Sequence, residues 1–146
     1  MLVMLLPDQI SSKWNIIKRG IEVSVPPTIT SSPKVMNNIL MGLLEGSAQC
    51  WVEYEVVKEK SIVYGFLITT VMEDFLSGVR NLLIYSLYGA RPIDDDIWVR
   101  GLITLRKYAK ANNCEKVIAY SNIERIEEIV RSLGGKVEWK FISFPV

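Results

Sequence analysis

Residues 81–121 constrain the fold more than any other stretch, because they read as a strand, a turn, a long helix and a second strand. Residues 82–85 and 117–120 are runs of mainly apolar residues, a pattern typical of strands buried on both faces. Between them, apolar side chains recur at helical spacing and form one stripe: Trp98, Leu102, Leu105 and Ala109. Two buried strands joined by an amphipathic helix predict a right-handed crossover with parallel strands.

Two helices are predicted nearer the N-terminus. Residues 8–19 carry apolar side chains three or four positions apart, and the glycine that follows, Gly20, is expected to end this helix. Ser32 and Pro33 are a favoured cap and first residue for a second helix, which Gly46 ends.

Residues 50–57 alternate between apolar and polar side chains, and residues 61–71 form another strand-like run, so an antiparallel pair is predicted. Gly65 within the second run predicts a bulge or a close approach of backbone. After the crossover, Ser121 and Glu124 are spaced as a capping box for a last helix. A final strand is predicted from the alternation of Val137, Trp139 and Phe141. The whole order predicts an α/β fold with a mixed sheet.

Composition indicates one globular domain over residues 1–146, because 49% of the residues are hydrophobic and the formal net charge is only +1. This balance gives no electrostatic reason to expect nucleic acid or an anionic membrane as a partner. The apolar residues 1–6 are far fewer than the roughly 20 of a membrane helix. They also lack a basic start and a cleavage site, so we expect a strand or a packed terminus rather than a signal peptide.

The chain contains no histidine and only two cysteines, Cys50 and Cys114. Without histidine, Ser-His and Cys-His nucleophilic catalysis and the commonest zinc sites are excluded. Two isolated cysteines predict neither a disulfide framework nor a metal site, and neither has a basic neighbour that would activate its thiol. Reduced thiols and a cytoplasmic location are therefore expected.

The combined order of elements resembles the GNAT superfamily of N-acetyltransferases. Residues 108–114 followed by Val117 and Ile118 look like the end of that family's third helix and its fifth strand. Asn122 and the Leu133-Gly134 pair look like the segment that follows that strand. The resemblance implies a V between two splayed parallel strands, in which acetyl-CoA lies. It would place the V between residues 85–88 and 120–122. If acetyl-CoA binds, the implied cofactor-binding residues are Tyr85, Ser86, Leu87 and Asn122.

The family's pyrophosphate motif is not matched where the resemblance places it, at residues 93–98. The motif is Arg or Gln, two residues, Gly, one residue, then Gly or Ala, and its glycine positions are occupied here by Asp96 and Trp98. Residues 94–96 are three aspartates, which suit a helix N-terminus but repel a pyrophosphate by roughly 1 kcal/mol per close pair even in bulk water. Acetyl-CoA is thus implied by the resemblance and unsupported by this loop, unless the alignment shifts or a divalent cation bridges the charges.

No catalytic residue is identified from the sequence. The family's usual general acid is a tyrosine in the last helix, and Val130 occupies that position. A hydroxyl could come instead from Tyr85, Tyr88 or Tyr120, although strand tyrosines more often serve packing. Glu53 and Glu55 could supply a base, but their alternation predicts that both face solvent.

Two hypotheses follow. The first is a GNAT-like binding or assembly module without cofactor, whose partner is an unknown protein. The second is an acetyl-CoA-dependent N-acetyltransferase with an atypical cofactor loop and a small amine substrate. Small divergent proteins of this resemblance are common in phage genomes, so a phage-encoded, virion-associated chain is one expectation. Oligomeric state is left open, and fold alone does not decide between the two functions.

Overall fold

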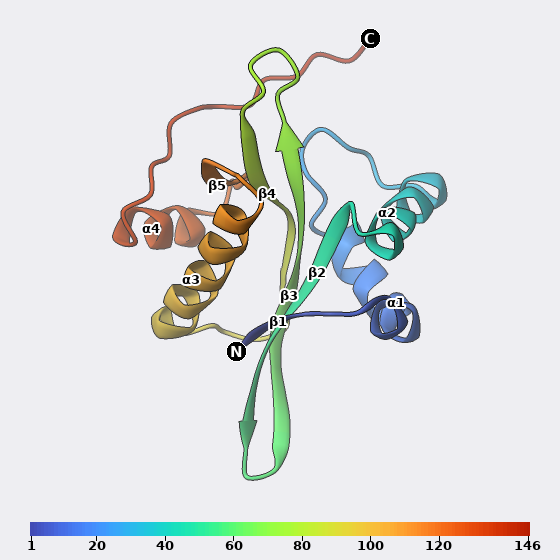
Figure 1. Cartoon of the computed structure of the whole chain (residues 1–146), viewed down its shortest axis with the longest axis vertical. Coiled ribbons are helices and arrows are strands. Elements are labelled where there is room, and N and C mark those ends of the chain that lie inside the picture. The colour runs from blue at the N-terminus through green and yellow to red at the C-terminus, as the bar shows by residue number, and fades with distance from the viewer.

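The computed structural model describes residues 1–146 and contains one five-stranded sheet between two layers of helices (Figure 1). The strands are β1 (Leu2–Met4), β2 (Ala48–Val57), β3 (Lys60–Glu73), β4 (Arg80–Gly89) and β5 (Lys116–Ala119). The helices are α1 (Pro7–Glu22), α2 (Pro33–Glu45), α3 (Asp95–Ala111) and α4 (Glu124–Ser132). The strands lie in chain order across the sheet, and only β4 and β5 are parallel. This mixed α/β architecture confirms the predicted fold class.

The predicted crossover is present. Leu83 on β4 lies beside Ile118 on β5 in a parallel register, and α3 joins the two strands. Leu105 and Ala109 are buried on α3 as expected, but at the start of the helix Ile97 is buried and Trp98 is only half-buried. At the N-terminal end of α3, the side chain that faces the core is thus one residue earlier than predicted.

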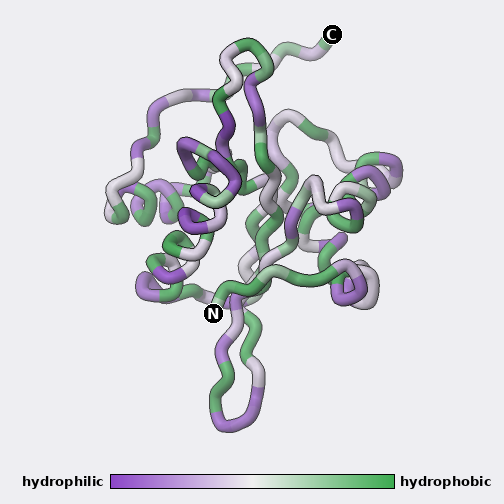
Figure 2. Tube along the Cα trace, viewed as in Figure 1, coloured by the Kyte–Doolittle hydropathy of each residue, from purple (hydrophilic) through white to green (hydrophobic).

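Each face of the sheet has its own core. Figure 2 shows that hydrophobic residues recur along the strands between the helix layers. The face under α1 and α2 buries Ile10, Ile17, Ile21, Met36, Leu43, Cys50, Phe66 and Ile68. The face under α3 buries Leu2, Trp51, Leu67, Leu82, Leu105 and Ala109. Two separate clusters form because successive side chains of a strand point to opposite faces. No helix is long and apolar enough to cross a bilayer.

The prediction that Gly20 ends the first helix is wrong. Helix α1 continues to Glu22, and Ile21 is fully buried. A Cβ at Gly20 would lie 2.2 Å from the Phe66 ring, so the residue is glycine because the helix packs closely on β3 there. A helical glycine that is buried against a neighbour carries the same sequence signal as one that stops a helix.

The start and end of α2 follow the prediction. The Ser32 hydroxyl accepts a hydrogen bond from the Val35 amide at 3.2 Å, and Gly46 takes the left-handed conformation with a φ of 86°. The bulge at Gly65 is also present, because the pairing register between β2 and β3 shifts next to it. A Cβ on Gly65 would lie 2.2 Å from the Tyr88 carbonyl oxygen, so only glycine fits this close approach.

The predicted final strand is absent. The residues after α4 form no regular structure, and Trp139 is 90% exposed. Alternation selects one face of a strand, but a strand also needs a partner backbone, and β5 is paired only with β4. The predicted capping box is wrong too: Ile123 is the N-cap of α4, and the Ser121 hydroxyl accepts from the Ile123 amide instead.

Replacing Leu105 with alanine should lower the free energy of unfolding by about 2–5 kcal/mol, because it leaves a cavity between α3 and the sheet. The matched control is Ile103→Ala on the exposed side of the same helix, which should change stability by less than about 0.5 kcal/mol. Denaturant unfolding followed by circular dichroism measures both. Equal effects of the two substitutions would contradict the assigned face of α3.

Candidate functional site

The strands β4 and β5 separate partway along the sheet. Their pairing ends at Ile84 beside Ala119, and β4 continues for several residues to Gly89 without a partner on that side. On its other side β4 stays paired with β3 up to Gly89. The result is a V that opens beside Tyr85, Ser86 and Leu87, three of the residues that the sequence indicated.

A β-bulge reshapes β4 at the point where the V begins. The register with β3 shifts between Ile68 and Thr69, which leaves Tyr85 as the extra residue. Tyr85 packs on the α1 and α2 side of the sheet, and the buried Ser86 also faces α1 through its contact with Ser24. Ser24 donates to the Gly20 carbonyl at 2.6 Å, so the Ser86 hydroxyl is the donor in the 2.6 Å contact between the two serines.

Tyr85 lines a cavity between α2 and the sheet of about 370 Å³. The other lining side chains are apolar or neutral: Ile29, Val35, Asn38, Ile39, Ser47, Ala48, Ile68 and Thr70, with Gly42 at the wall. Burial raises the pKa of Tyr85 above its usual value, so its hydroxyl stays protonated at neutral pH. The cavity lining carries no charged side chain, so it suits a neutral or apolar ligand better than a cation.

The start of α3 is acidic, as the sequence indicated. Asp94 is the N-cap, and its backbone carbonyl accepts from the amides of Ile97 and Trp98. Asp95 is paired with Arg125 of α4 at 2.8 Å, and Asp96 with Arg100 at 3.4 Å. We call residues 94–96 the acidic helix start. Its carboxylates occupy the helix end that would otherwise attract an external anion.

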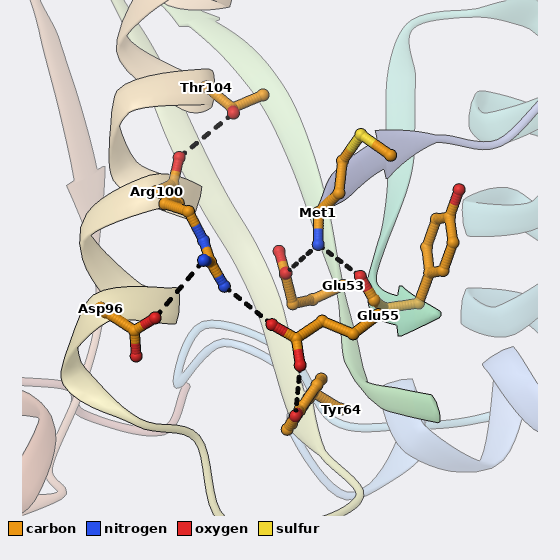
Figure 3. A network of polar contacts seen from close by, with 8 residues as sticks. Met1, Glu53, Glu55, Tyr64, Asp96, Arg100 and Thr104 are labelled. Carbon is orange, nitrogen blue, oxygen red and sulfur yellow. Dashed lines mark hydrogen bonds and ion pairs between the residues drawn. The ribbon is translucent and has the colours of Figure 1, made fainter. Parts of the chain in front are cut away.

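The prediction that Glu53 and Glu55 both face solvent is wrong. Glu53 is only 7% exposed and lies 2.5 Å from the amino group of Met1, and Glu55 pairs with Arg100 at 3.0 Å (Figure 3). The Tyr64 hydroxyl donates to Glu55 at 2.9 Å, and this hydrogen bond raises the pKa of Tyr64 above its usual value. Both glutamates share the sheet face of Trp51, which packs in the core under α3. They lie on the opposite face from Tyr85 and could not serve it as a base.

The other candidates are dispersed. Tyr88 packs against Phe66 with ring centroids 5.3 Å apart, and Tyr120 meets Phe141 at 6.1 Å. Leu87 points into the core under α3, and Asn122 is exposed between β5 and α4. Val130 is half-buried on α4. The structure thus brings Tyr85 and Ser86 together and leaves the remaining candidates apart. Sequence reasoning missed the Ser24 partner and the cavity, because neither has a local signal.

Cysteine chemistry has no place in this site. Cys50 is fully buried on β2, and burial raises the pKa of its thiol to about 12. Cys114 is half-buried at the end of α3, on the other face of the sheet. No group of three or more acidic or cysteine side chains gathers where it could hold a metal ion.

In the folded protein, a thiol reagent at about pH 8 should modify Cys114 and leave Cys50 unmodified. The reagent reacts with the thiolate, and burial both covers Cys50 and raises the pKa of its thiol. Unfolding in denaturant should then expose the second thiol. Mass spectrometry of the labelled chain reads the positions, and Cys114→Ser is the control that should show no rapid labelling. Rapid labelling of Cys50 in the folded state would contradict its burial under α1 and α2.

No family model and no curated protein matches the chain. Solved structures do match over its whole length. One is a predicted acetyltransferase from Clostridium acetobutylicum with acetyl-CoA, at a TM-score of 0.70 and 14% identity, covering 99% of this chain and 95% of that chain. Another is glucosamine-6-phosphate N-acetyltransferase from Arabidopsis thaliana, at a TM-score of 0.66 and 14% identity, covering 99% and 97%. A third is an aminoglycoside acetyltransferase from an uncultured soil sample in complex with sisomicin, at a TM-score of 0.65 and 16% identity, covering 100% and 94%. The likeness shows the fold: this chain has the fold of the GNAT N-acetyltransferases.

Proposed function

We propose that this chain is a GNAT-fold binding or assembly module that does not use acetyl-CoA. The observation that carries the proposal is the acidic helix start. In the family that the sequence resembles, the cofactor pyrophosphate sits on the amides at this helix end, and here Asp94, Asp95 and Asp96 place three carboxylates at that end. The residues present do not fit that group.

The electrostatics support the same conclusion. Two of the three carboxylates are paired with arginines, but both arginines come from within the fold and are already shared with other acids. Arg100 also pairs with Glu55, and Arg125 also contacts Glu128 at 3.6 Å. The pair between Asp95 and Arg125 further ties the N-terminus of α3 to α4. A pyrophosphate would have to displace this pair and face the freed carboxylate, at roughly 1 kcal/mol per close like-charge pair in water and more near a protein surface.

We expect the unmodified protein to show no saturable binding of acetyl-CoA below about 1 mM in calorimetry, which corresponds to less than about 4.1 kcal/mol of binding free energy. Replacing all of Asp94, Asp95 and Asp96 with asparagine should create measurable affinity, because it removes the charge and keeps the side-chain shape.

The matched control changes the net charge equally at three exposed glutamates that form no ion pair: Glu45→Gln, Glu59→Gln and Glu115→Gln. This control should not bind. Micromolar binding by the unmodified protein would refute the proposal, and equal gains in both variants would mean that net charge rather than the acidic helix start opposes the cofactor.

A second candidate is an N-acetyltransferase with an atypical cofactor loop. The observation that favours it is the V between β4 and β5 together with Tyr85 in the neighbouring cavity. Because that cavity carries no charged side chain, its acceptor would be a neutral or apolar amine rather than a polycation.

If this second function holds, coenzyme A release with a panel of apolar amines should exceed the uncatalysed rate. Tyr85→Phe should then reduce kcat by about 10²–10⁴-fold, the usual range for loss of a general acid. Tyr88→Phe on the same strand is the control and should leave the rate within a few-fold. No release with any amine would exclude this candidate for the panel tested.

A further inference from the structure

The two hairpins of the sheet end in turns of opposite character, at opposite ends of the long axis of the molecule (Figure 1). The turn between β2 and β3 consists of two charged residues, Lys58 and Glu59. The turn between β3 and β4, residues 74–79, is called here the apolar turn. It presents Phe75 and Leu76 side by side, with exposed fractions of 92% and 88%. Single apolar residues in solvent are ordinary, but two large neighbours at the tip of one turn mark a contact surface.

The backbone of the apolar turn is satisfied within the turn itself. The Asp74 carboxylate accepts hydrogen bonds from the amides of Leu76 at 2.9 Å and Ser77 at 3.0 Å. The Ser77 hydroxyl accepts from the Val79 amide at 3.2 Å. The Asp74 amide donates to the Val79 carbonyl at 2.8 Å, and the Gly78 amide donates to the Asp74 carbonyl at 2.6 Å. Five of the six amides of this turn therefore have a partner that is not water.

These internal hydrogen bonds favour a lipid surface over other partners. In water an exposed amide always finds an acceptor, and a protein partner can supply one across an interface. The acyl region of a bilayer supplies none, so backbone that enters it must be satisfied from within. The apolar turn combines the two properties that such a contact needs, which are large apolar side chains at its tip and amides that are already bonded.

The shape of this end of the molecule also suits a bilayer. Phe75 and Leu76 border a hollow of about 340 Å³, yet their exposure means that nearly all of each side chain projects away from the protein. A protein partner would need a pocket of matching shape for each of them, whereas a lipid surface deforms around a convex point. The chain end marked C lies at the same end of the long axis (Figure 1), and Ile142 and Phe144 before it are 75% and 86% exposed.

The charges near the apolar turn select neutral lipids. Glu73 pairs with Arg80 at 3.2 Å across the base of the hairpin. Beside Arg80, Glu115 is followed directly by Lys116. Asp74 is the remaining charge, and the amides that it accepts hold its pKa below the usual value, so it stays ionised at neutral pH. This balance offers no positive patch to anionic lipids, while the ammonium group of a phosphocholine headgroup can face Asp74.

We propose that the apolar turn inserts into the surface of a neutral lipid bilayer. Phe75 and Leu76 enter the upper acyl region, Asp74 stays among the headgroups, and Ile142 and Phe144 make a second contact at the same end. The near-zero net charge gave no reason to expect an anionic membrane, and this contact requires none. The inference goes beyond the proposed function and does not depend on whether acetyl-CoA binds.

Flotation of the full chain with vesicles of phosphatidylcholine alone tests the proposal. At about 1 mM lipid, at least half of the unmodified protein should float, which needs an association constant of about 10³ M⁻¹, roughly a tenth of that given by one myristoyl chain. The double variant Phe75→Ser, Leu76→Ser should bind at least about tenfold more weakly, because binding scales with the apolar area that is buried.

The matched control lies on the opposite hairpin. Val56→Ser with Val63→Ser removes two apolar side chains that are 64% and 44% exposed, and it should float as the unmodified protein does. Circular dichroism should show both double variants folded, since all four side chains lie largely in solvent.

The depth of the contact has its own readout. Phe75→Trp places an indole at the tip of the apolar turn, and phosphatidylcholine with brominated acyl chains should quench its emission. The indole of Val56→Trp should not be quenched. Each signal is read as the difference from the unmodified protein, which has four tryptophans of its own.

Sodium chloride and a lipid-free measurement separate this contact from the alternatives. Flotation should persist in 1 M salt, where charges are screened beyond about 3 Å. Absence of flotation, release by salt, a need for phosphatidylserine, or equal losses in the two double variants would each overturn the proposal. Light scattering without lipid should show no oligomer that the Phe75 and Leu76 substitutions abolish. Such an oligomer would assign the turn to a protein contact instead.

Discussion

The parallel pairing of β4 with β5 is the contact on which the rest of this structure depends. It can form only if a helix returns the chain from one end of the sheet to the other, and α3 does so while covering one apolar face. The opposite face is covered by α1 and α2, and α1 packs so closely on the Phe66 ring of β3 that a Cβ at position 20 would lie 2.2 Å from it. Because the pairing stops at Ile84, the same contact also creates the V at which the candidate site lies.

Helix α3, which closes this crossover, begins with three aspartates, Asp94, Asp95 and Asp96. The N-terminus of a helix attracts negative charge, and in this chain Asp94, Asp95 and Asp96 place three carboxylates at that end. Arg100 and Arg125 pair with two of those carboxylates and connect α3 to β2 and to α4. The first turn of α3 thus takes part in exposed ion pairs within the fold, and its three carboxylates are the physical basis for proposing a module rather than an enzyme.

The unusual apolar surface of the protein lies away from the V. The hairpin between β3 and β4 is held by hydrogen bonds from the Leu76 and Ser77 amides to the Asp74 carboxylate. Phe75 and Leu76 are therefore exposed on an ordered turn. Near the hairpin, the buried side-chain oxygen of Asn81 has no hydrogen-bond donor within the protein.

The sequence by itself determined the cap of α2 and the acidic helix start, because each depends on residues within one or two turns of one another. It also determined the crossover, because the change from strand to helical spacing and back is visible along residues 81–121. Gly65 was also readable as a bulge. Tertiary structure decided what depends on distant partners. Gly20 continues a helix because Phe66 lies above it, Glu53 is buried on a strand that reads as half-polar, and the alternation around Trp139 yields no strand because no neighbouring backbone pairs with it. The bulge at Tyr85, the cavity beside it and the orphan oxygen of Asn81 likewise arise only when strands far apart in the sequence pack together.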